Sequence, residues 1–406
     1  MRYLIICFLL LATACSAAPP APPAATTAAT PAPPAPTAAP PRGTETFPTT
    51  APAGSLASAT PAEAPAALLP APLYVLERGQ IARIEPDGAT RNQVTRERLE
   101  IEGFPPISNF AVGPGSELAY VVGALEGDRL VRTGPQGEDN RTIYSDPGHE
   151  LSHLVWAADG ESLFLRLLNN KEVIDIPSGV YQVPAGGGEF QLIRADDPVD
   201  DPLNPSRSLR GYRPVALSPG GDHLLVEAFS LFYEGCDYAF LALDGSEPQL
   251  ILPPEGLQTY CGEAHFAPDG SVLLMIGPPV GPNSGPTIWR AQPDGSLAPV
   301  DPAQPLGRAP APLDETRVLF IQVTLPEDPA GEVIFQPALL PNPQPFSTPF
   351  NDQLERALWA PNGSGVVVAV APLNEDRLLR WIPGTGEPVM LPSTREAIDE
   401  LHWGDE

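Results

Sequence analysis

One short segment near the middle of the chain has the spacing of a zinc site. His149, Glu150 and His153 form the pattern HExxH, in which two imidazoles on one helical face share a zinc ion and the glutamate acts as general base. The pattern runs directly into Leu154 and an apolar, strand-like segment. In a strand the two histidines would be separated by about 13 Å, at about 3.3 Å per residue, and could not bind one ion. We therefore expect neither a metal site nor proteolysis here.

Four carboxylates lie close together in a second segment, at Asp196, Asp197, Asp200 and Asp201. Oxygen-rich loops of this kind suit calcium, and they also suit a cationic partner. No glycine-turned loop organises these side chains in the way a helix–loop–helix calcium site requires. We therefore favour a solvated acidic loop and keep a cation-binding loop as the alternative.

The four cysteines divide into two pairs. Cys7 and Cys15 lie in the apolar N-terminal segment, whereas Cys236 and Cys261 lie in the body of the chain. Two remaining cysteines in an exported protein favour one structural disulfide, with two buried thiols as the alternative.

The first 15 residues have the features of an export signal. Arg2 precedes an apolar run from Leu4 to Leu11, and small residues lead into Cys15. About eight apolar residues are too few to span a hydrocarbon core of about 30 Å. Small residues before a cysteine resemble the bacterial lipobox, although Ala12 stands where leucine is usual. The resemblance implies a lipidated Cys15 that anchors the exported protein to a membrane of the cell envelope; ordinary signal cleavage is the alternative.

The next segment, residues 16–71, consists mostly of alanine, proline and threonine. It has too few large apolar side chains to offset the entropy lost on ordering, so we expect a disordered linker with polyproline character. The formal net charge of -27 falls mainly on the remaining body. Such a surface repels phosphate backbones, and nucleic-acid binding is therefore not expected.

The body, residues 72–406, contains a repeated phrase. An apolar residue, often Trp or Phe, is followed by small residues or proline, then Asp, Asn or Gly with Gly, and then an apolar run. The copies begin at Val112, Trp156, Leu217, Phe266, Pro312 (a degenerate copy), Trp359 and Trp403. Successive complete copies lie 44, 61 and 49 residues apart, and the longest of these intervals contains an insertion at 196–210. Units of about 40–50 residues are typical of four-stranded propeller blades.

The phrase predicts its own local structure. Glycine after Asp or Asn supplies a tight hairpin, and a second turn later in each unit gives four strands. The recurring aromatics are interpreted as core packing rather than a ligand cage. The segment from Pro72 to Val94 holds three strands, and the C-terminal segment ending in Trp403 supplies a fourth. The prediction is an all-β propeller of seven four-stranded blades whose two termini share one blade, or six blades if the degenerate unit is an insertion. Cys236 is expected to begin the third strand of one blade and Cys261 to precede the first strand of the next, so a disulfide between them would join adjacent blades.

The phrases resemble the TolB-type or WD-like propeller repeat, in which an aromatic residue precedes Ser-Pro-Asp-Gly. The most similar copies begin at Phe266 and Trp359, and the resemblance covers residues 72–406. It implies a propeller that binds peptides or proteins on one face.

The expected function is a tethered, non-catalytic platform that binds a protein, peptide or glycan, as a monomer and without a cofactor. The sequence contains no GxSxG, Walker A or dinucleotide-binding motif. The alternative is a metal-dependent lyase or hydrolase that uses scattered carboxylates with His223, His265 or His402. A structural spacer without a specific ligand is the third possibility.

Overall fold

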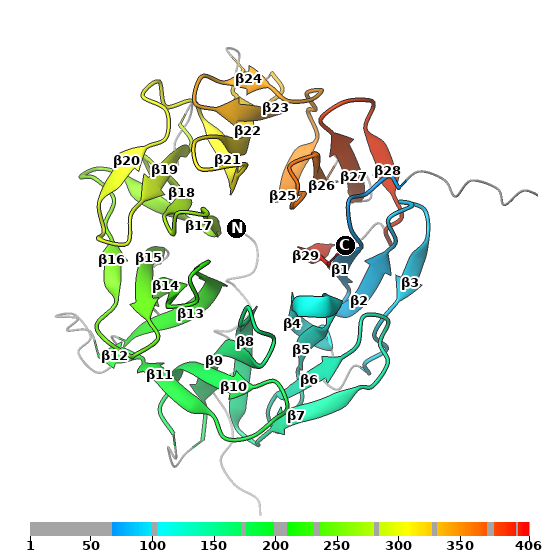
Figure 1. Cartoon of the computed structure of the whole chain (residues 1–406), viewed down its shortest axis with the longest axis vertical. Helices are drawn as coiled ribbons and strands as arrows, with labels where there is room; N and C mark the ends of the chain where they lie inside the picture. Colours follow the sequence, from blue (N-terminus) through cyan, green and yellow to red (C-terminus); the bar gives the residue numbers. More distant parts are fainter. Residues whose placement is uncertain are drawn as a thin grey trace, which may run out of the picture. The chain divides into compact units, whose positions relative to one another are not determined.

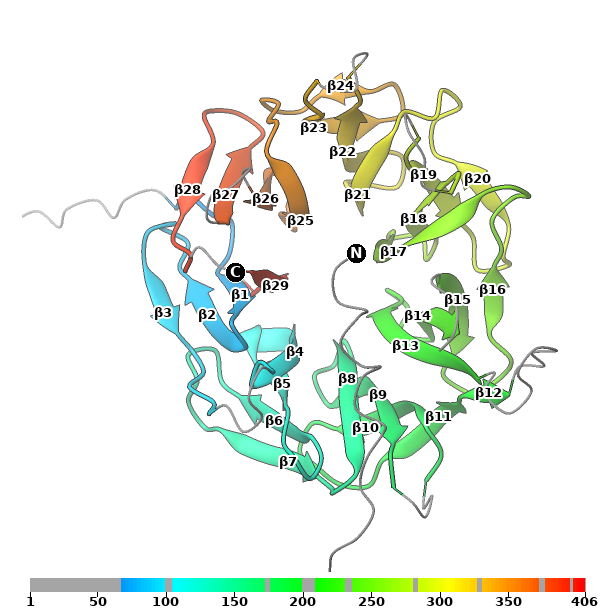
Figure 2. The ribbon, with the colours of Figure 1, turned by 180° about the vertical axis from the view of Figure 1, so that it is seen from behind.

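The described residues form a ring of seven antiparallel sheets (Figures 1 and 2). The computed structural model describes residues 67–98, 104–171, 176–198, 209–230, 236–279, 284–326, 331–371, 377–394 and 397–405. The predicted signal and most of the linker lie outside these residues. Within the described ranges, no helix is long and apolar enough to cross a membrane.

We name the sheets blades A to G in chain order and give their strands from the centre outwards. Blade A contains β29 (Ile398–Trp403), β1 (Leu73–Glu77), β2 (Gln80–Ile84) and β3 (Arg91–Gln93). Blade B contains β4 (Ile107–Val112), β5 (Leu118–Val122), β6 (Arg129–Thr133) and β7 (Arg141–Ser145), with the short 3-10 helix η1 (Pro114–Ser116) after β4. Blade C contains β8 (His149–Trp156), β9 (Ser162–Asn169), β10 (Gly179–Pro184) and β11 (Gln191–Ala195).

Blade D contains β13 (Leu209–Leu217), β14 (His223–Ser230), β15 (Cys236–Ala242) and β16 (Gln249–Ile251), and the two-residue β12 (Asp197–Pro198) pairs with the start of β13. Blade E contains β17 (Gln258–Phe266), β18 (Val272–Gly277), β19 (Thr287–Ala291) and β20 (Leu297–Pro299). Blade F contains β21 (Gly307–Pro312), β22 (Val318–Thr324), β23 (Ile334–Leu340) and β24 (Gln344–Pro345). Blade G contains β25 (Gln353–Trp359), β26 (Gly365–Ala371), β27 (Leu378–Pro383) and β28 (Val389–Leu391).

The prediction of seven blades is confirmed. The degenerate copy at Pro312 belongs to a complete blade F, so the alternative of six blades is wrong. Blade D has the extra strand β12, which begins in the insertion expected between two repeats. The shared blade is also confirmed, because β29 pairs with β1 in the register Leu73↔Trp403 and Tyr74↔His402.

Further contacts hold the C-terminal strand to the ring. The Gly404 N–H donates to the Pro72 carbonyl at 2.8 Å, and the Asp405 N–H donates to the Ser116 hydroxyl at 2.8 Å. The Asp405 carboxylate accepts a hydrogen bond from the Gly115 N–H. The last strand therefore completes blade A and is also attached to blade B.

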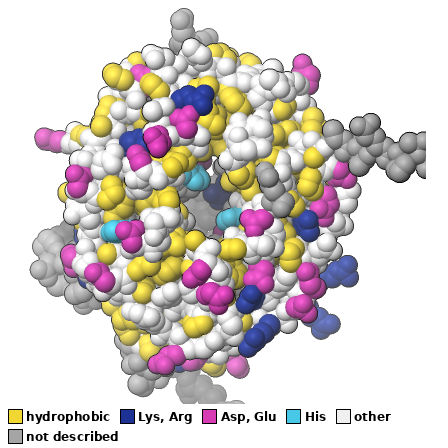
Figure 3. Space-filling view, in the orientation of Figure 1, with side chains coloured by type: hydrophobic (Ala, Val, Ile, Leu, Met, Phe, Trp, Pro, Cys, Tyr) yellow, Lys and Arg dark blue, Asp and Glu magenta, His cyan; other side chains and the backbone are white. Residues whose placement is uncertain are grey.

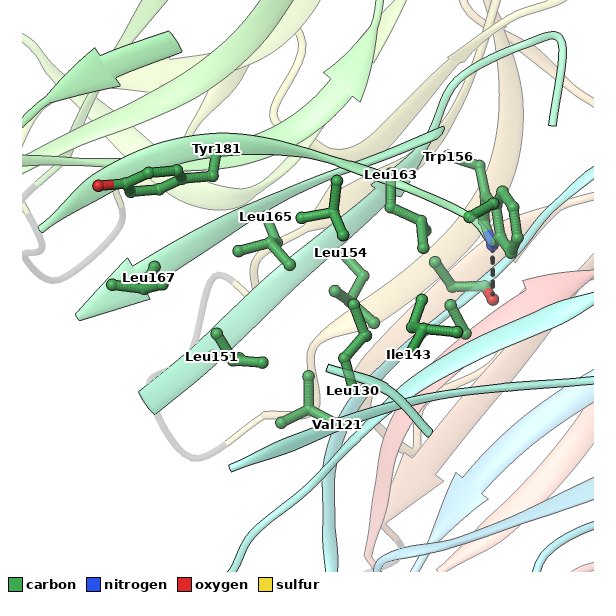
Figure 4. Close-up of a cluster of buried hydrophobic side chains, with 14 residues drawn as sticks. Val121, Leu130, Ile143, Leu151, Leu154, Trp156, Leu163, Leu165, Leu167 and Tyr181 are labelled. Atoms are coloured by element: carbon green, nitrogen blue, oxygen red, sulfur yellow. Dashed lines mark hydrogen bonds between the residues drawn. The ribbon is translucent and has the colours of Figure 1, made fainter. Parts of the chain in front are cut away.

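The core lies between neighbouring blades. Figure 4 shows one such cluster, in which side chains from β5 and β6 of blade B meet side chains from β8, β9 and β10 of blade C. Burial of one such aliphatic side chain contributes about 1.5–3 kcal/mol to folding. Since each cluster needs two adjacent blades, the ring is stable only as a whole.

The repeated tryptophans have a further role in joining blades. Trp156 donates its indole N–H to the Ala111 carbonyl of blade B at 3.2 Å, the dashed line in Figure 4. Trp359 donates to the Ala309 carbonyl of blade F at 2.7 Å, and Trp403 donates to the Trp359 carbonyl of blade G at 2.7 Å. In each case the donor contacts the inner strand of the preceding blade. The aromatics are therefore part of the core, as predicted.

Replacing the indole of Trp359 tests this bond between blades. We expect Trp359→Phe to lower the free energy of unfolding by about 1–3 kcal/mol, because the buried Ala309 carbonyl loses this donor. Trp289→Phe is the matched control. Trp289 is equally buried but donates to the hydroxyl of Thr287, which keeps its own bond to the Ile276 carbonyl. Denaturant unfolding measures both losses, and equal losses would contradict the role assigned to Trp359.

Candidate functional site

The HExxH segment forms part of strand β8, as predicted, and not a helix. His149 is buried, and its Nδ1 lies 2.5 Å from the Tyr144 hydroxyl. His153 lies on the same strand but takes part in a different cluster, described below. Among the residues that the structure describes, no three His, Cys, Asp or Glu side chains come together in a way that could hold a metal ion.

Two of the four acidic residues in the predicted cation-binding loop lie within the described part of the chain. Asp196 forms a two-pronged ion pair with Arg166, at 2.7 and 2.8 Å. Asp197 accepts hydrogen bonds from the Tyr212 hydroxyl at 2.5 Å and from Arg194 at 2.7 Å. Both carboxylates already have cationic or hydroxyl partners. Asp200 and Asp201 lie outside the described residues.

The structure places a disulfide between Cys236 and Cys261, whose Cα atoms are 6.0 Å apart. Cys236 begins β15, the third strand of blade D. Cys261 lies inside β17, the first strand of blade E, and not before that strand as expected. The bond joins adjacent blades, and the neighbouring Gly262 N–H contacts the hydroxyl of Tyr238 at 2.9 Å.

His223, one of the histidines considered for an enzyme, lies beside Ser218 and Asp222 in a pocket of about 350 Å³ between blades D and E. Ser, His and Asp are the residue types of a catalytic triad, but the hydrogen bonds among Ser218, Asp222 and His223 do not have the arrangement of one. The Ser218 hydroxyl donates to Asp222 at 2.9 Å and accepts from the backbone N–H groups of Asp222 and His223. Since Ser218 stabilises a turn and has no bond to the imidazole, it lacks the adjacent base that would activate a nucleophile.

The other two histidines of that set lie on inner strands of separate blades. His402, on β29, packs edge-on against Phe110 with ring centroids 4.6 Å apart. His265, on β17, keeps an accessible surface. The protein around it still reduces the solvation of its imidazole, and this lowers the pKa of the ring. The structure therefore does not bring His223, His265 and His402 together.

The inner strands β29, β4, β8, β13, β17, β21 and β25 surround a space that we call the central hollow. Figure 3 shows it on one face, with Lys or Arg and His side chains at its edge. All seven inner strands share an irregularity, because the pairing of each with its neighbour shifts register at one point along the strand. A bulge interrupts the regular alternation of side chains between the two faces of a sheet and so changes the direction in which they point. Polar residues lie within or near these bulges on the inner strands.

Some of these polar residues connect neighbouring blades. Glu400 of β29 accepts hydrogen bonds from the Asn109 side chain at 2.5 Å and from the Phe110 N–H at 3.0 Å. Asn109 in turn accepts from the Leu154 N–H of blade C at 2.8 Å. Glu263 of β17 accepts from the Ala309 N–H of blade F at 2.8 Å. These side chains are occupied by structural bonds.

Arg166 on β9 is also fully engaged. Besides its ion pair with Asp196, it donates to the Tyr212 carbonyl at 3.0 Å, and its guanidinium lies 4.9 Å from the centre of the Phe229 ring. It is 4% exposed. A buried arginine with these partners holds blades C and D together and has little capacity for a ligand.

Arg213 on β13 differs from Arg166. Its guanidinium lies 3.8 Å from the centre of the Phe229 ring, and its nearest carboxylate, Glu227, is 3.9 Å away. Within the described residues it makes no hydrogen bond, and its side chain is 38% exposed. Burial raises the pKa of the Glu227 carboxyl, whereas the charge of Arg213 and the hydrogen bond from the Gly262 N–H oppose that shift. Arg213 therefore has N–H donors that no described residue engages in a hydrogen bond.

His153 on β8 is the third member of this group, which we call the arginine–histidine cluster (Arg166, Arg213 and His153). It lies at the bulge with φ of +56°, a left-handed conformation that is strained for a residue with a side chain. Its Nδ1 is buried without a partner in the described structure. Burial, and then the charge of Arg213, lower the pKa of the imidazole to about 4, with a smaller opposing effect from Glu400. At neutral pH the ring is uncharged.

Sequence reasoning missed the cluster, although a signal was present. Each inner strand carries a polar side chain three or four residues before its repeat phrase, and the set is Asn109, His153, Arg213, Glu263, Arg308, Arg356 and Glu400. His153 and Glu263 lie inside the register shift of their strands, whereas the other five lie at paired positions near a shift. The cluster offers a stacked guanidinium and a neutral imidazole, both of which can form hydrogen bonds with a ligand.

Solved structures share this fold at low sequence identity. A structure from a study of two prolyl endopeptidases matches with 10% identity and a TM-score of 0.52, over 81% of this chain and 51% of that chain. A puromycin-hydrolyzing peptidase of Mycobacterium tuberculosis matches with 15% identity and a TM-score of 0.53, over 77% and 48%. TolB from Acinetobacter baumannii has 18% identity and a TM-score of 0.41, over 80% and 78%.

The chain spans about half the length of these two peptidases. At such identities the likeness shows the β-propeller fold alone. Neither a protein-family model nor a curated protein matches the sequence.

The pKa of His153 tests the geometry of the cluster. NMR titration of the imidazole should give a pKa of about 4 in the wild type, and a higher value in Arg213→Gln, because a nearby positive charge is removed. Arg356→Gln, which removes an exposed charge from another inner strand, should leave that pKa unchanged. Equal effects of the two substitutions would contradict the assigned proximity.

The same shift affects stability. The pKa of His153 is lower in the folded protein than the ordinary value of 6.5, so the unfolded chain takes up the proton first as the pH falls. The contribution of His153 to stability is therefore complete above pH 6.5 and is lost as the pH falls toward 4. Wild type should lose stability relative to His153→Gln across this window, and a difference independent of pH would contradict the assignment.

Proposed function

We propose that this protein is an exported, membrane-tethered propeller that binds a protein, peptide or glycan of the cell envelope without chemical change, and that the ligand enters the central hollow. The observation that carries the proposal is the arrangement of Arg213 and His153. Asn109, Glu263, Arg308 and Glu400 form hydrogen bonds to a neighbouring blade. Arg213 and His153 retain hydrogen-bonding groups that no described residue engages. Unused polar groups in a concave site, beside a strained residue, are typical of binding sites.

The absence of a catalytic arrangement within the described ranges fits binding rather than catalysis. The hydroxyl of Ser218 is directed to a turn, and the described histidines of blades A, D and E are apart from one another. A ring that depends on contacts between all its blades is also a rigid support for a binding surface.

The location is part of the proposal and rests on the N-terminal sequence. Lipidation of Cys15 would hold the protein at a membrane, since each buried methylene contributes about 0.8 kcal/mol. The linker of residues 16–71 would then hold the propeller away from the membrane surface.

Substitution of Cys15 tests the anchor. The full chain expressed in a bacterial host should incorporate a fatty-acid label and sediment with membranes, whereas Cys15→Ala should lose the label and be released. Cys7→Ala, within the same apolar segment, is the matched control and should retain both properties. Labelling that persists in Cys15→Ala would refute lipidation at this residue.

Photo-crosslinking tests the use of the hollow. A benzophenone amino acid replaces Ser108, an exposed residue on the inner strand β4, or Met390, which is 50% exposed on the outermost strand β28. After illumination in the native envelope, we expect an adduct of discrete mass from position 108 and none from position 390. An adduct from position 390 alone, or from neither position, would contradict ligand binding in the hollow.

A further inference from the structure

The inference concerns the chemistry that the cluster recognises, and it rests on the proposed function. Of the two arginines in the cluster, only Arg213 retains free donors, because Arg166 is held by Asp196 and the Tyr212 carbonyl. The guanidinium of Arg213 is stacked on Phe229, so its planar edge is left for a ligand. A guanidinium edge forms two parallel hydrogen bonds with a planar anion such as a carboxylate.

The surroundings limit the charge that can be accommodated. Within the cluster as the structure describes it, Arg213 is the cation that makes no hydrogen bond, His153 is neutral, and the Glu227 carboxylate lies 3.9 Å from Arg213. A group with two negative charges would meet repulsion that a single guanidinium does not offset. The strongly acidic body, with a formal net charge of -27 for the chain, also repels polyanions.

We propose that Arg213 and His153 form a binding site for a single carboxylate group of the ligand, either the C-terminal carboxylate of a peptide or a uronic acid of a glycan. Arg213 supplies the charge and the paired donors. His153 lies beside the bound carboxylate and contributes a neutral, polar side chain to the site. The phenyl ring of Phe229 fixes the plane of the guanidinium before the ligand arrives.

A bound anion should be detectable at His153. The imidazole faces Arg213 on β13 and Arg166 on β9, which lower its pKa, and Glu400 on β29, which raises it; the neutral Asn109 side chain lies on β4. A carboxylate at Arg213 offsets the nearer positive charge, so addition of sodium trifluoroacetate, a carboxylate that stays ionised near pH 4, should raise the pKa of His153. Sodium chloride at equal ionic strength is the control, and an identical response to both salts would overturn the site.

The ligand class is tested with four probes by calorimetry on the intact protein. Tetra-alanine with a free C-terminus is compared with its C-terminal amide, and glucuronate is compared with glucose. We expect binding of the carboxylate member of at least one pair, and the pair that responds identifies the source of the carboxylate. Equal binding of both members, or no binding in either pair, would overturn the proposal.

The residue assignment is tested with the carboxylate probe that binds. Loss of a charge-assisted contact in Arg213→Gln should weaken binding about tenfold to a hundredfold. Arg356→Gln has the same charge change and should bind as the wild type does. Arg213→Lys retains the charge without the planar guanidinium, and its affinity for the probe should lie between those of the wild type and Arg213→Gln. Such an intermediate affinity shows that the loss in Arg213→Gln is a loss of recognition and not of folding. Equal affinities of Arg213→Gln and Arg356→Gln would overturn the assignment.

The two proposals can fail separately. If crosslinking from position 108 captures a ligand while the carboxylate probes do not bind, the hollow is the binding site but carboxylate recognition is wrong. If the probes bind through Arg213 and no ligand is captured, the anion site stands and the platform function is wrong.

Discussion

The pairing of β29 with β1 is the constraint on which the rest of the structure depends. Each hydrophobic cluster lies between two blades, so a ring with one blade missing a strand would leave apolar surface and a sheet edge exposed. Closure by the two ends of the propeller removes that edge, and the contacts of Gly404 and Asp405 extend the last strand into blade B. The position of every inner strand, and thus of the central hollow, follows from this closure.

Some polar residues of the inner strands hold neighbouring blades together, and others are left for binding. Each inner strand bends at a bulge, where a polar side chain can satisfy the backbone of the next blade. Glu400, Asn109 and Glu263 do so. Arg213 and His153 occupy the same type of position in blades D and C without comparable bonds. A repeated structural position can thus acquire a binding role where its side chain is not used in a bond between blades.

The sequence predicted the architecture because the repeat is a local signal. Glycine turns and aromatics recur every 40–50 residues, and they identified all seven blades, including the degenerate one at Pro312. The cluster could not be predicted in the same way, because a bulge depends on the register between two strands and not on the residues of one strand. Cys261 illustrates the difference, since the pairing was expected but its place inside β17 was set by the same irregular register.

The charge of the chain explains why one arginine can be selective. The acidic surface repels anions at a distance, but at physiological salt this field decays over about 8 Å, whereas a contact inside the hollow is screened much less. An anion therefore gains affinity only if its carboxylate reaches Arg213 and the rest of the ligand fits the ring of inner strands. Stacking on Phe229 and the ion pair of Arg166 with Asp196 hold the arginines apart and fix the free one in place. Selectivity then arises from geometry within the hollow, with long-range attraction contributing little.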